Sequence, residues 1–141
     1  MIILDTNVLF ELFRPTPDRN VLAWLDAPTA TEIATTAITA AELLYGVERL
    51  PDGKRKAALR EGVRQVLDED FEGRIETFDK AAAEQYSMIV AERDRLGRPI
   101  STGDAQIASI ARRLGATLAT RNTKDFEDTG IKLIDPWGPT S

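Results

Sequence analysis

The stretch Ile2-Ile3-Leu4-Asp5-Thr6-Asn7 indicates the fold class, because a short apolar run passes directly into polar residues. Three consecutive apolar side chains are typical of a strand that is covered on both faces. Asp5 and Thr6, which follow at once, are residue types that begin helices. The stretch therefore predicts a buried strand over residues 2–4 and a helix over residues 6–13.

The same alternation of strand and helix patterns continues along the chain. We expect further strands at 33–36, 75–78, 117–120 and 131–134, and helices at 18–26, 39–49, 52–67, 79–96 and 101–114. Strands that alternate with amphipathic helices are typical of an α/β fold with a mainly parallel central sheet. Ligands bind such sheets at the carboxyl ends of the strands, so the residues that follow each strand are the candidates for chemistry.

Length and composition fit an ordinary globular protein. The 141 residues suit one domain, and we expect it to span residues 1–141, with a hydrophobic fraction of 43% to build its core. No apolar run approaches the roughly 20 residues of a membrane span. The first residues also lack the basic region and long apolar stretch of a signal peptide, so we expect a cytoplasmic protein.

The chain contains no cysteine and no histidine, which excludes several kinds of chemistry. Disulfides, thiolate nucleophiles, Ser-His-Asp catalysis and zinc sites built from Cys or His are all ruled out. An enzyme of this composition must rely on carboxylates, hydroxyls, amides, Lys and Arg. Of these groups, carboxylates bind hard cations such as Mg²⁺, Mn²⁺ and Ca²⁺. The formal net charge of −5 is unusual for a nucleic-acid-binding protein, so any basic surface must be local.

Two aspartates stand where a parallel sheet would bring them together. Asp5 follows the first strand, and Asp104 lies three residues before Ile107 on the inward-facing stripe of its helix. A carboxylate on that stripe costs free energy unless it is paired, protonated or bound to a metal. Both positions have a structural alternative, because Asp5 and the pattern Ser101-x-x-Asp104 could simply cap helices.

Glu42, Asn122 and Asp125 complete the polar candidates. Thr39-x-x-Glu42 matches a capping box, which predicts that Glu42 closes the start of its helix. Asn122 and Asp125 follow the strand at 117–120, where an ordinary polar turn is the structural alternative.

A metal site is the functional interpretation of these acids. If Asp5, Glu42 and Asp104 converge at one sheet edge, they repel one another and need a divalent cation to be ionised together. Mg²⁺ typically binds one or two protein carboxylates and keeps several waters. One such water could attack a phosphodiester while the metal stabilises charge on the phosphate, and a second metal could join with substrate.

Four segments of the chain resemble the PIN-domain family, and in particular its VapC and FitB-like toxins. The segments are Met1–Leu9, Ala37–Val47, Asp104–Ala108 and Ala119–Phe126, and Pro136-Trp137 resembles the FitB-like ending. Each motif is weak alone, but the four occur in the family's order and span essentially the whole chain. The resemblance implies a three-layer α/β/α sandwich and an endoribonuclease that depends on Mg²⁺ or Mn²⁺.

The resemblance also implies roles for individual residues. Asp5, Glu42 and Asp104 match the family's three most regular acids, and Asp5 and Asp104 would be the main metal ligands. Asn122 stands where some relatives have Asp, so it adds an oxygen to the catalytic set but no charge. The residues implied to bind substrate are Thr6, Thr120, Arg121 and Lys124.

The implied partners are an RNA substrate, a second copy of the chain in a homodimer, and a cognate antitoxin. The antitoxin would form a hetero-oligomer with the toxin and block its active site. A basic run in the helix at 52–67 is interpreted as a solvated face, with RNA contact as the alternative; it comprises Lys54, Arg55, Lys56, Arg60 and Arg64. Arg121 and Lys124, beside the acids, are better placed to hold phosphate.

Other functions stay open at this point. A haloacid-dehalogenase-like phosphatase would need a second Asp at the position of Asn7. A DNA-directed nuclease would use the same chemistry as a ribonuclease. The main alternative is a catalytically weak PIN-like domain that binds an antitoxin or RNA without cutting, for which Asn122 gives a motive. A non-catalytic domain would bind divalent cations weakly and tolerate Asp104→Asn.

Overall fold

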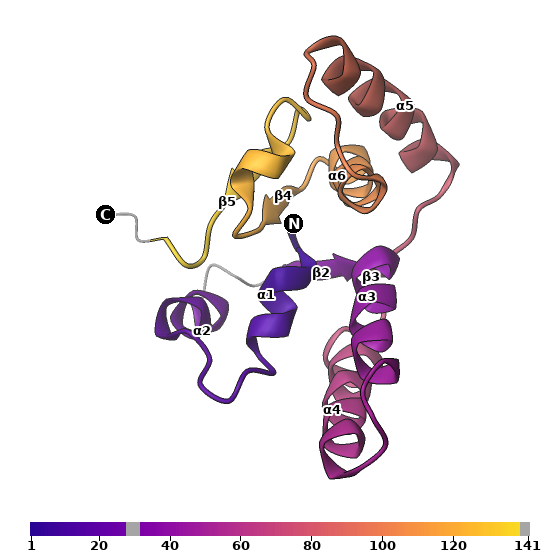
Figure 1. Cartoon of the computed structure of the whole chain (residues 1–141). Coiled ribbons are helices and arrows are strands. Elements are labelled where there is room, and N and C mark those ends of the chain that lie inside the picture. The colour runs from indigo at the N-terminus through magenta and orange to yellow at the C-terminus, as the bar shows by residue number, and fades with distance from the viewer. Residues whose placement is uncertain (28–31, 139–141) are drawn as a thin grey trace.

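The computed structural model of the chain describes residues 1–27 and 32–138, and residues 28–31 and 139–141 of the expected domain lie outside this description. In the described residues, five parallel strands form one sheet with the order β3-β2-β1-β4-β5 (Figure 1). The strands are β1 (Ile2–Leu4), β2 (Ile33–Thr36), β3 (Ile75–Glu76), β4 (Thr117–Ala119) and β5 (Lys132–Ile134). The expected parallel sheet is confirmed, although β3, β4 and β5 are shorter than predicted.

Helices cover both faces of this sheet. They are α1 (Thr6–Glu11), α2 (Arg19–Asp26), α3 (Ala37–Glu48), α4 (Lys54–Gln65), α5 (Lys80–Arg95) and α6 (Thr102–Leu114). Helices α1 to α4 pack on one face and α5 and α6 on the other, each with its own buried apolar cluster (Figure 1). The expected three-layer α/β/α sandwich is therefore confirmed. No helix in the described part of the chain is long and apolar enough to cross a membrane.

The side chains of the central strands alternate between the two apolar clusters. In β1, Leu4 packs among the helices α1 to α4, whereas Ile3 packs against α5 and α6. In β4, Ala119 packs among the helices α1 to α4, whereas Leu118 packs against α5 and α6. The side chains of these two residues, like those of Ile3 and Leu4, are fully buried. Because both faces are covered, the strands are continuous apolar runs rather than alternating patterns.

Local signals mark several helix ends as the sequence predicts. Asp79 Oδ1 accepts the Ala82 N–H at 2.9 Å at the start of α5, and Ser101 Oγ accepts the Asp104 N–H at 3.2 Å at the start of α6. Gly115 ends α6 with a φ of 62°, in the left-handed region that favours glycine. These ends depend on contacts within one turn of helix, which is why the sequence predicts them.

Several helix boundaries differ from the prediction, and α1 ends at Glu11 rather than at residue 13. Helix α3 begins at Ala37, because the hydroxyl of Thr36 accepts the Thr39 N–H at 3.1 Å and so provides the cap. The prediction that Thr39 and Glu42 form a capping box is therefore wrong, and the Glu42 side chain is available for another role. Helix α4 begins after Gly53 and ends at Gln65, and a π-helical turn, η1 (Val66–Asp70), continues it.

Phe10 of α1 and Phe13, which follows α1, pack directly against the backbones of α3 and α4. A β-carbon on Gly46 of α3 would lie 3.2 Å from Phe10 Cζ, and one on Gly62 of α4 would lie 3.1 Å from Phe13 Cε1. Both distances are shorter than ordinary carbon contacts, so the absent side chains leave the room that the two rings use. This packing fixes α3 and α4 beside the residues that follow β1.

Candidate active site at the carboxyl edge of the sheet

Asp5 lies at the carboxyl end of β1 and is only 5% exposed. Its Oδ1 accepts the Thr6 N–H at 2.8 Å, so the side chain caps α1, and its Oδ2 accepts the Thr120 hydroxyl at 2.8 Å. Burial raises the pKa of Asp5 to about 6, since it outweighs these two bonds, and the carboxylates of Asp104 and Glu42 raise it further. Asp5 is thus both a helix cap and a member of an acidic group.

Thr120 is the hydroxyl that orients Asp5. It follows β4 and is fully buried. While it donates to Asp5, its Oγ1 accepts the Asn122 N–H at 3.1 Å and the Asn7 side-chain amide at 3.3 Å. The Asn7 carbonyl oxygen in turn accepts the Arg121 N–H at 3.3 Å. These bonds hold the loop after β4 against the start of α1.

Glu42 is held by a chain of threonine hydroxyls. The Thr6 hydroxyl donates to Glu42 Oε1 at 3.1 Å and lies 3.0 Å from the Thr39 hydroxyl. The Thr36 hydroxyl donates to Thr39 at 3.4 Å. Because each hydroxyl has one proton, Thr39 must donate to Thr6 while Thr6 donates to Glu42. The chain Thr36–Thr39–Thr6 therefore directs its last proton at the Oε1 atom of Glu42.

Asp104 lies in the first turn of α6 and is half-buried. Burial raises its pKa, and the charge of Asp125 raises it further, whereas the Ser101 hydroxyl and Arg93 lower it. Asp104 and Glu42 line the same open pocket of about 460 Å³ between α3 and α6. The structure therefore brings Asp104, Glu42 and Asp5 to one edge, with Asp125 close enough to act on Asp104.

Arg93 fixes the loop that carries Asn122 and Asp125. Its guanidinium is 5% exposed and donates to the carbonyl oxygens of Asp125 and Glu127, each at 2.9 Å, and to that of Arg98 at 2.6 Å. These bonds join α5 to the 3₁₀ turn η2 (Thr123–Phe126). A buried arginine that satisfies three carbonyls serves as a rigid support for this side of the site.

The donor set suits a hard divalent cation. Carboxylate and amide oxygens are the ligands that Mg²⁺ and Mn²⁺ prefer, and carboxylates that repel one another gain free energy when a cation joins them. Among residues 1–27 and 32–138, no three acidic side chains converge closely enough to enclose an ion by themselves. The set therefore fits an ion with one or two direct carboxylate ligands and a remaining shell of water.

The expected substrate-binding residues fall into two groups. Thr6 and Thr120 are buried beneath the carboxylates, where their hydroxyls serve Glu42 and Asp5. Arg121 and Lys124 are exposed on the loop after β4. The Asn122 side chain is also exposed and does not cap η2.

Sequence reasoning missed Asn7, Thr39 and Arg93. Arg93 had a detectable signal, because it lies four residues after the buried Ile89 and so continues the inward stripe of α5. The capping pattern conceals the role of Thr39, but Thr39 lies in an otherwise apolar segment, where a buried hydroxyl needs a partner. Asn7 has no such signal, since its partners Thr120 and Arg121 are far away in the sequence.

The chain is similar to known proteins in both sequence and fold. The family described as PIN domain matches residues 2–132. The VapC ribonuclease Y4jK of Sinorhizobium fredii is 39% identical over 139 residues, which cover 99% of both chains. Toxin FitB of Neisseria gonorrhoeae is 39% identical over 97% of this chain and 99% of its own. The crystal structure of FitAcB from Neisseria gonorrhoeae superposes with a TM-score of 0.92 at 39% identity, covering 99% of this chain and 100% of that one.

Proposed function

Because the chain belongs to the PIN-domain family, we propose that it is a divalent-metal-dependent endoribonuclease and the toxin of a toxin–antitoxin pair. The observation that carries this proposal is the acidic edge of the sheet, where the buried Asp5 feels the charges of Asp104 and Glu42. Neighbouring carboxylates whose negative charges repel one another are stabilised by a bound cation and poorly stabilised without one. The absence of Cys and His from the chain leaves these oxygens as its main means of catalysis.

We assign Asp5 and Asp104 as the direct ligands of Mg²⁺ or Mn²⁺, with Glu42 and Asn122 completing the catalytic group through water. When bound, the ion would supply positive charge for the scissile phosphate and acidify a water for attack. The chain's own residues orient the ligands before RNA arrives. The hydroxyl of Thr120 orients Asp5, and the hydroxyl of Thr6 orients Glu42.

Arg121 and Lys124 give this edge of the sheet exposed positive charges. Both are exposed on the loop that follows β4, beside Asn122. RNA carries a negative charge at each phosphate, and cations at the rim offset the repulsion that the carboxylates would otherwise exert. We therefore assign both side chains to phosphates of the substrate rather than to the reacting atoms.

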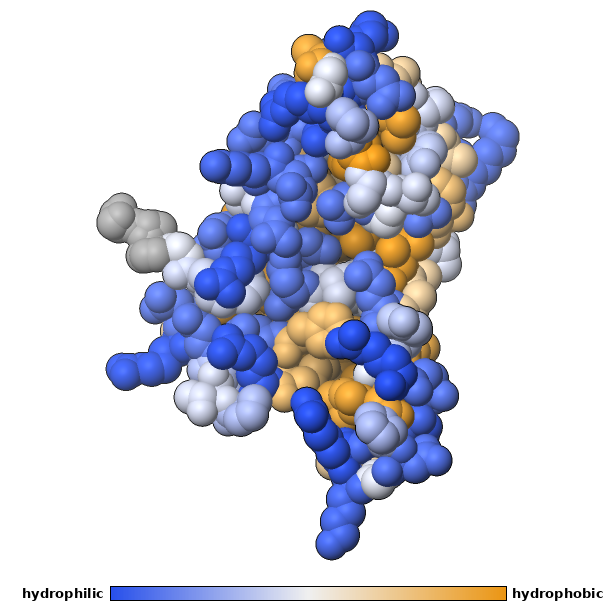
Figure 2. Space-filling model, in the orientation of Figure 1, coloured by the Kyte–Doolittle hydropathy of each residue, from blue (hydrophilic) through white to orange (hydrophobic). Residues whose placement is uncertain are grey.

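The family membership supports partners for this chain. We propose that the chain acts in the cytoplasm, where its RNA substrate is found, and that a cognate antitoxin binds it there and blocks the site. For self-association, Figure 2 shows apolar surface between the α5–α6 region and α3. Leu44 of α3 and Met88 of α5 are about half exposed, at 51% and 47%, and are candidates for the interface of a homodimer.

The decisive test is cleavage of a total-RNA pool by the full chain freed from antitoxin. We expect discrete fragments with Mg²⁺ or Mn²⁺, none in EDTA, and none with Asp104→Asn. The ends of the fragments would name the substrate. Asp128→Asn is the matched control, because Asp128 is exposed and pairs with Arg98 away from the carboxylates.

One outcome would replace the proposal. The chain would be a binding domain if the folded protein binds RNA but leaves it intact with either metal. In that case Asp104→Asn should bind RNA as the native chain does. Asn122, which brings no charge to the site, would then be the first position to restore to Asp.

A further inference from the structure

Glu42 has few contacts that hold its carboxylate in place. The residue is exposed, whereas Asp5 is buried and accepts hydrogen bonds on both carboxylate oxygens. In the part of the chain that the structure describes, no ion pair holds Glu42, and its side chain accepts one hydrogen bond, from the Thr6 hydroxyl at 3.1 Å. An exposed glutamate on a helix ordinarily moves among several rotamers. The position of the Glu42 carboxylate therefore depends on Thr6.

A stripe of residues at a spacing of three leads from the core to this carboxylate. Thr36 ends β2, and Thr39 and Glu42 follow on α3, so that each lies beside the next on the helix surface. Thr36 and Thr39 are fully buried, whereas Glu42 is exposed. The Thr39 hydroxyl lies 3.4 Å from that of Thr36 and 3.0 Å from that of Thr6. Thr39 therefore connects the buried end of the stripe to α1.

The direction of these hydrogen bonds depends on Thr39. A threonine hydroxyl has one proton, so Thr6 can donate either to Glu42 or to Thr39. Thr39 accepts the proton of Thr36 and donates its own to Thr6, which leaves the Thr6 proton for Glu42. Without the Thr39 hydroxyl, the Thr6 oxygen loses the donor that fixes its rotation. The direction of the Thr6 proton thus depends on a residue whose side chain bonds Thr6 rather than Glu42.

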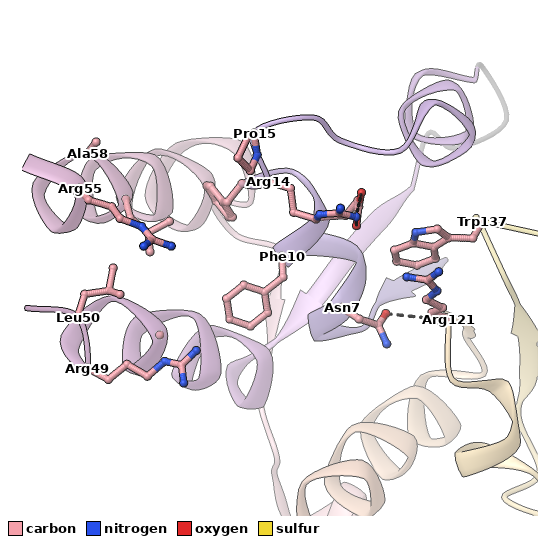
Figure 3. Close-up of a pocket in the computed structure, with 14 residues that line it drawn as sticks. Asn7, Phe10, Arg14, Pro15, Arg49, Leu50, Arg55, Ala58, Arg121 and Trp137 are labelled. Atoms are coloured by element: carbon pink, nitrogen blue, oxygen red, sulfur yellow. Dashed lines mark hydrogen bonds and ion pairs between the residues drawn. The ribbon is translucent and has the colours of Figure 1, made fainter.

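Packing one helical turn away holds α1 and α3 in close contact. Phe10 follows Thr6 by one turn, and Gly46 follows Glu42 by one turn. A β-carbon on Gly46 would lie 3.2 Å from Phe10 Cζ, and Figure 3 shows the Phe10 ring reaching from α1 toward α3. Because this contact is already tight, the two helices cannot move closer to replace a lost hydroxyl bond. Removal of the Thr39 hydroxyl should therefore release Glu42 without a shift of the helices.

We propose that Thr39 is a positioning residue of the ribonuclease, which acts through Thr6 to hold Glu42 at the acidic edge before metal and RNA bind. Glu42 shares its pocket with Asp104, so the rotamer of Glu42 decides whether it reaches the water shell of an ion held there. Groups that orient the residues of a metal site commonly change its activity or affinity by ten- to a hundredfold. The inference rests on the proposed ribonuclease function and deepens it, because it adds a buried residue to the catalytic machinery.

The first test compares Thr39→Val and Thr39→Ser in the full chain freed from antitoxin. Valine keeps the branched shape of threonine without the hydroxyl, and serine keeps the hydroxyl without the methyl group. The substrate is an oligonucleotide that spans a cleavage site found in the total-RNA digest. We expect Thr39→Val to lower kcat roughly tenfold with KM changed by less than about twofold. Thr39→Ser should keep kcat within about twofold of the native value, because it retains the donor to Thr6.

Thr35→Val is the matched control for the loss of a buried hydroxyl. Thr35 is also fully buried on β2, but its hydroxyl donates to the carbonyl oxygen of Leu4 at 2.9 Å and does not join the chain to Glu42. We expect Thr35→Val and Thr39→Val to lower the melting temperature by similar amounts, since each loses one buried bond. Only Thr39→Val should lower kcat. Equal losses of kcat in the two variants would overturn the positioning role.

The route through Thr6 predicts that two losses do not multiply. Thr6→Val removes the donor to Glu42, so the Thr39 hydroxyl has nothing left to orient in that variant. The kcat of the double variant Thr6→Val and Thr39→Val should therefore match that of Thr6→Val within about twofold. Losses that multiply would show that Thr39 acts on the site by another route, and would overturn the proposal.

A measurement without metal or RNA separates this inference from the nuclease function. In EDTA at one fixed pH, the ¹³C signal of the Glu42 carboxyl carbon reports the hydrogen bond on its oxygen, and its loss in Glu42→Gln identifies it. Thr39→Val should move this signal, whereas Thr39→Ser and Thr35→Val should leave it in place. A signal that moves in a chain that never cuts RNA keeps the control of Glu42 by Thr39 and loses the nuclease function. An unmoved signal or a native kcat in Thr39→Val overturns the role of Thr39, and metal-dependent cleavage by that variant leaves the nuclease function intact.

Discussion

At the scale of single residues, the carboxyl group of Asp5 is buried, yet it must carry a negative charge to bind a cation. Burial and the neighbouring acids oppose the ionisation of Asp5, so that its pKa lies above the ordinary value. The hydrogen bonds from Thr6 and Thr120 offset only part of that effect. Without a cation, an ionised Asp5 therefore lowers the stability of the native state.

Because burial opposes the ionisation of Asp5, the effect of Asp5→Asn on stability should depend on pH. The pKa of Asp5 is 3.8 in the unfolded chain and about 6 in the folded one, so the native state keeps its proton longer and loses stability as pH rises from about 4 to about 6. In EDTA at pH 8 we expect Asp5→Asn to be roughly 1–2 kcal/mol more stable than the native chain, and near equal to it at pH 4. Urea unfolding at both values measures this, and a difference that does not change with pH would refute the assignment.

Thr120→Val tests the hydroxyl that serves Asp5. Removal of the bond from Thr120 raises the pKa of Asp5 further above 6, because that bond lowers it in the native chain. We expect the rise of cleavage rate with pH to move to higher pH, and the chain to lose about 1–3 kcal/mol of stability. Ser109→Ala is the control, since the Ser109 hydroxyl is also buried but donates within α6, and an equal shift of the pH profile in this variant would contradict the prediction.

At the scale of elements, the site depends on how helices and turns are joined. The exposed bonds from Arg98 to Glu127 and Asp128 add little to stability, because solvent screens them. The buried Arg93 is different, since it satisfies three carbonyl oxygens that water cannot reach easily. It is the main connection between α5 and the turn η2.

We therefore expect Arg93→Met to destabilise the chain by about 3 kcal/mol and to impair cleavage. The loss of its charge also raises the pKa of Asp104, because Arg93 lowers that pKa in the native chain. Arg95→Met is the matched control on the same helix, as Arg95 is exposed and pairs with Glu92, and it should change stability by less than about 1 kcal/mol. Similar midpoints of urea unfolding for the two variants would rule out the supporting role of Arg93.

At the scale of the whole molecule, the acidic edge joins the layers of the sandwich. Asp5 belongs to the central sheet and α1, Glu42 to α3, and Asp104 to α6 on the opposite face. A cation held by Asp5 and Asp104 would connect the sheet to the α5–α6 layer. Its binding should consequently stabilise the global fold and not only one loop.

Addition of millimolar Mg²⁺ or Mn²⁺ should raise the melting temperature of the native chain by a few degrees, following mass action. The increase should disappear in Asp5→Asn and Asp104→Asn and persist in Asp128→Asn, whose exposed carboxylate pairs with Arg98. Scanning calorimetry measures the melting temperature. If metal does not change it in the native chain, the aspartates serve as helix caps rather than as metal ligands, or the metal site assembles only with RNA.

The sequence by itself determined the α/β sandwich, the main helix ends and the positions of the leading acids. Apolar runs such as Ile2-Ile3-Leu4 and caps such as Asp79, Ser101 and Gly115 depend on neighbours within a turn or two, so they can be read along the chain. Asp5 and Asp104 could be selected in the same way, as an acid after a strand and an acid on an inward stripe.

Only the tertiary structure decided what these residues contact. The sequence could not show that Thr36 rather than Thr39 caps α3, because both are good caps three residues apart. It also could not show that Thr6 directs Glu42, or that Arg55 is unpaired in the described residues while Arg60 is bound to Glu48. These contacts join residues of separate elements, and the packing of the layers brings them together, whereas periodicity reports only which face of an element is buried.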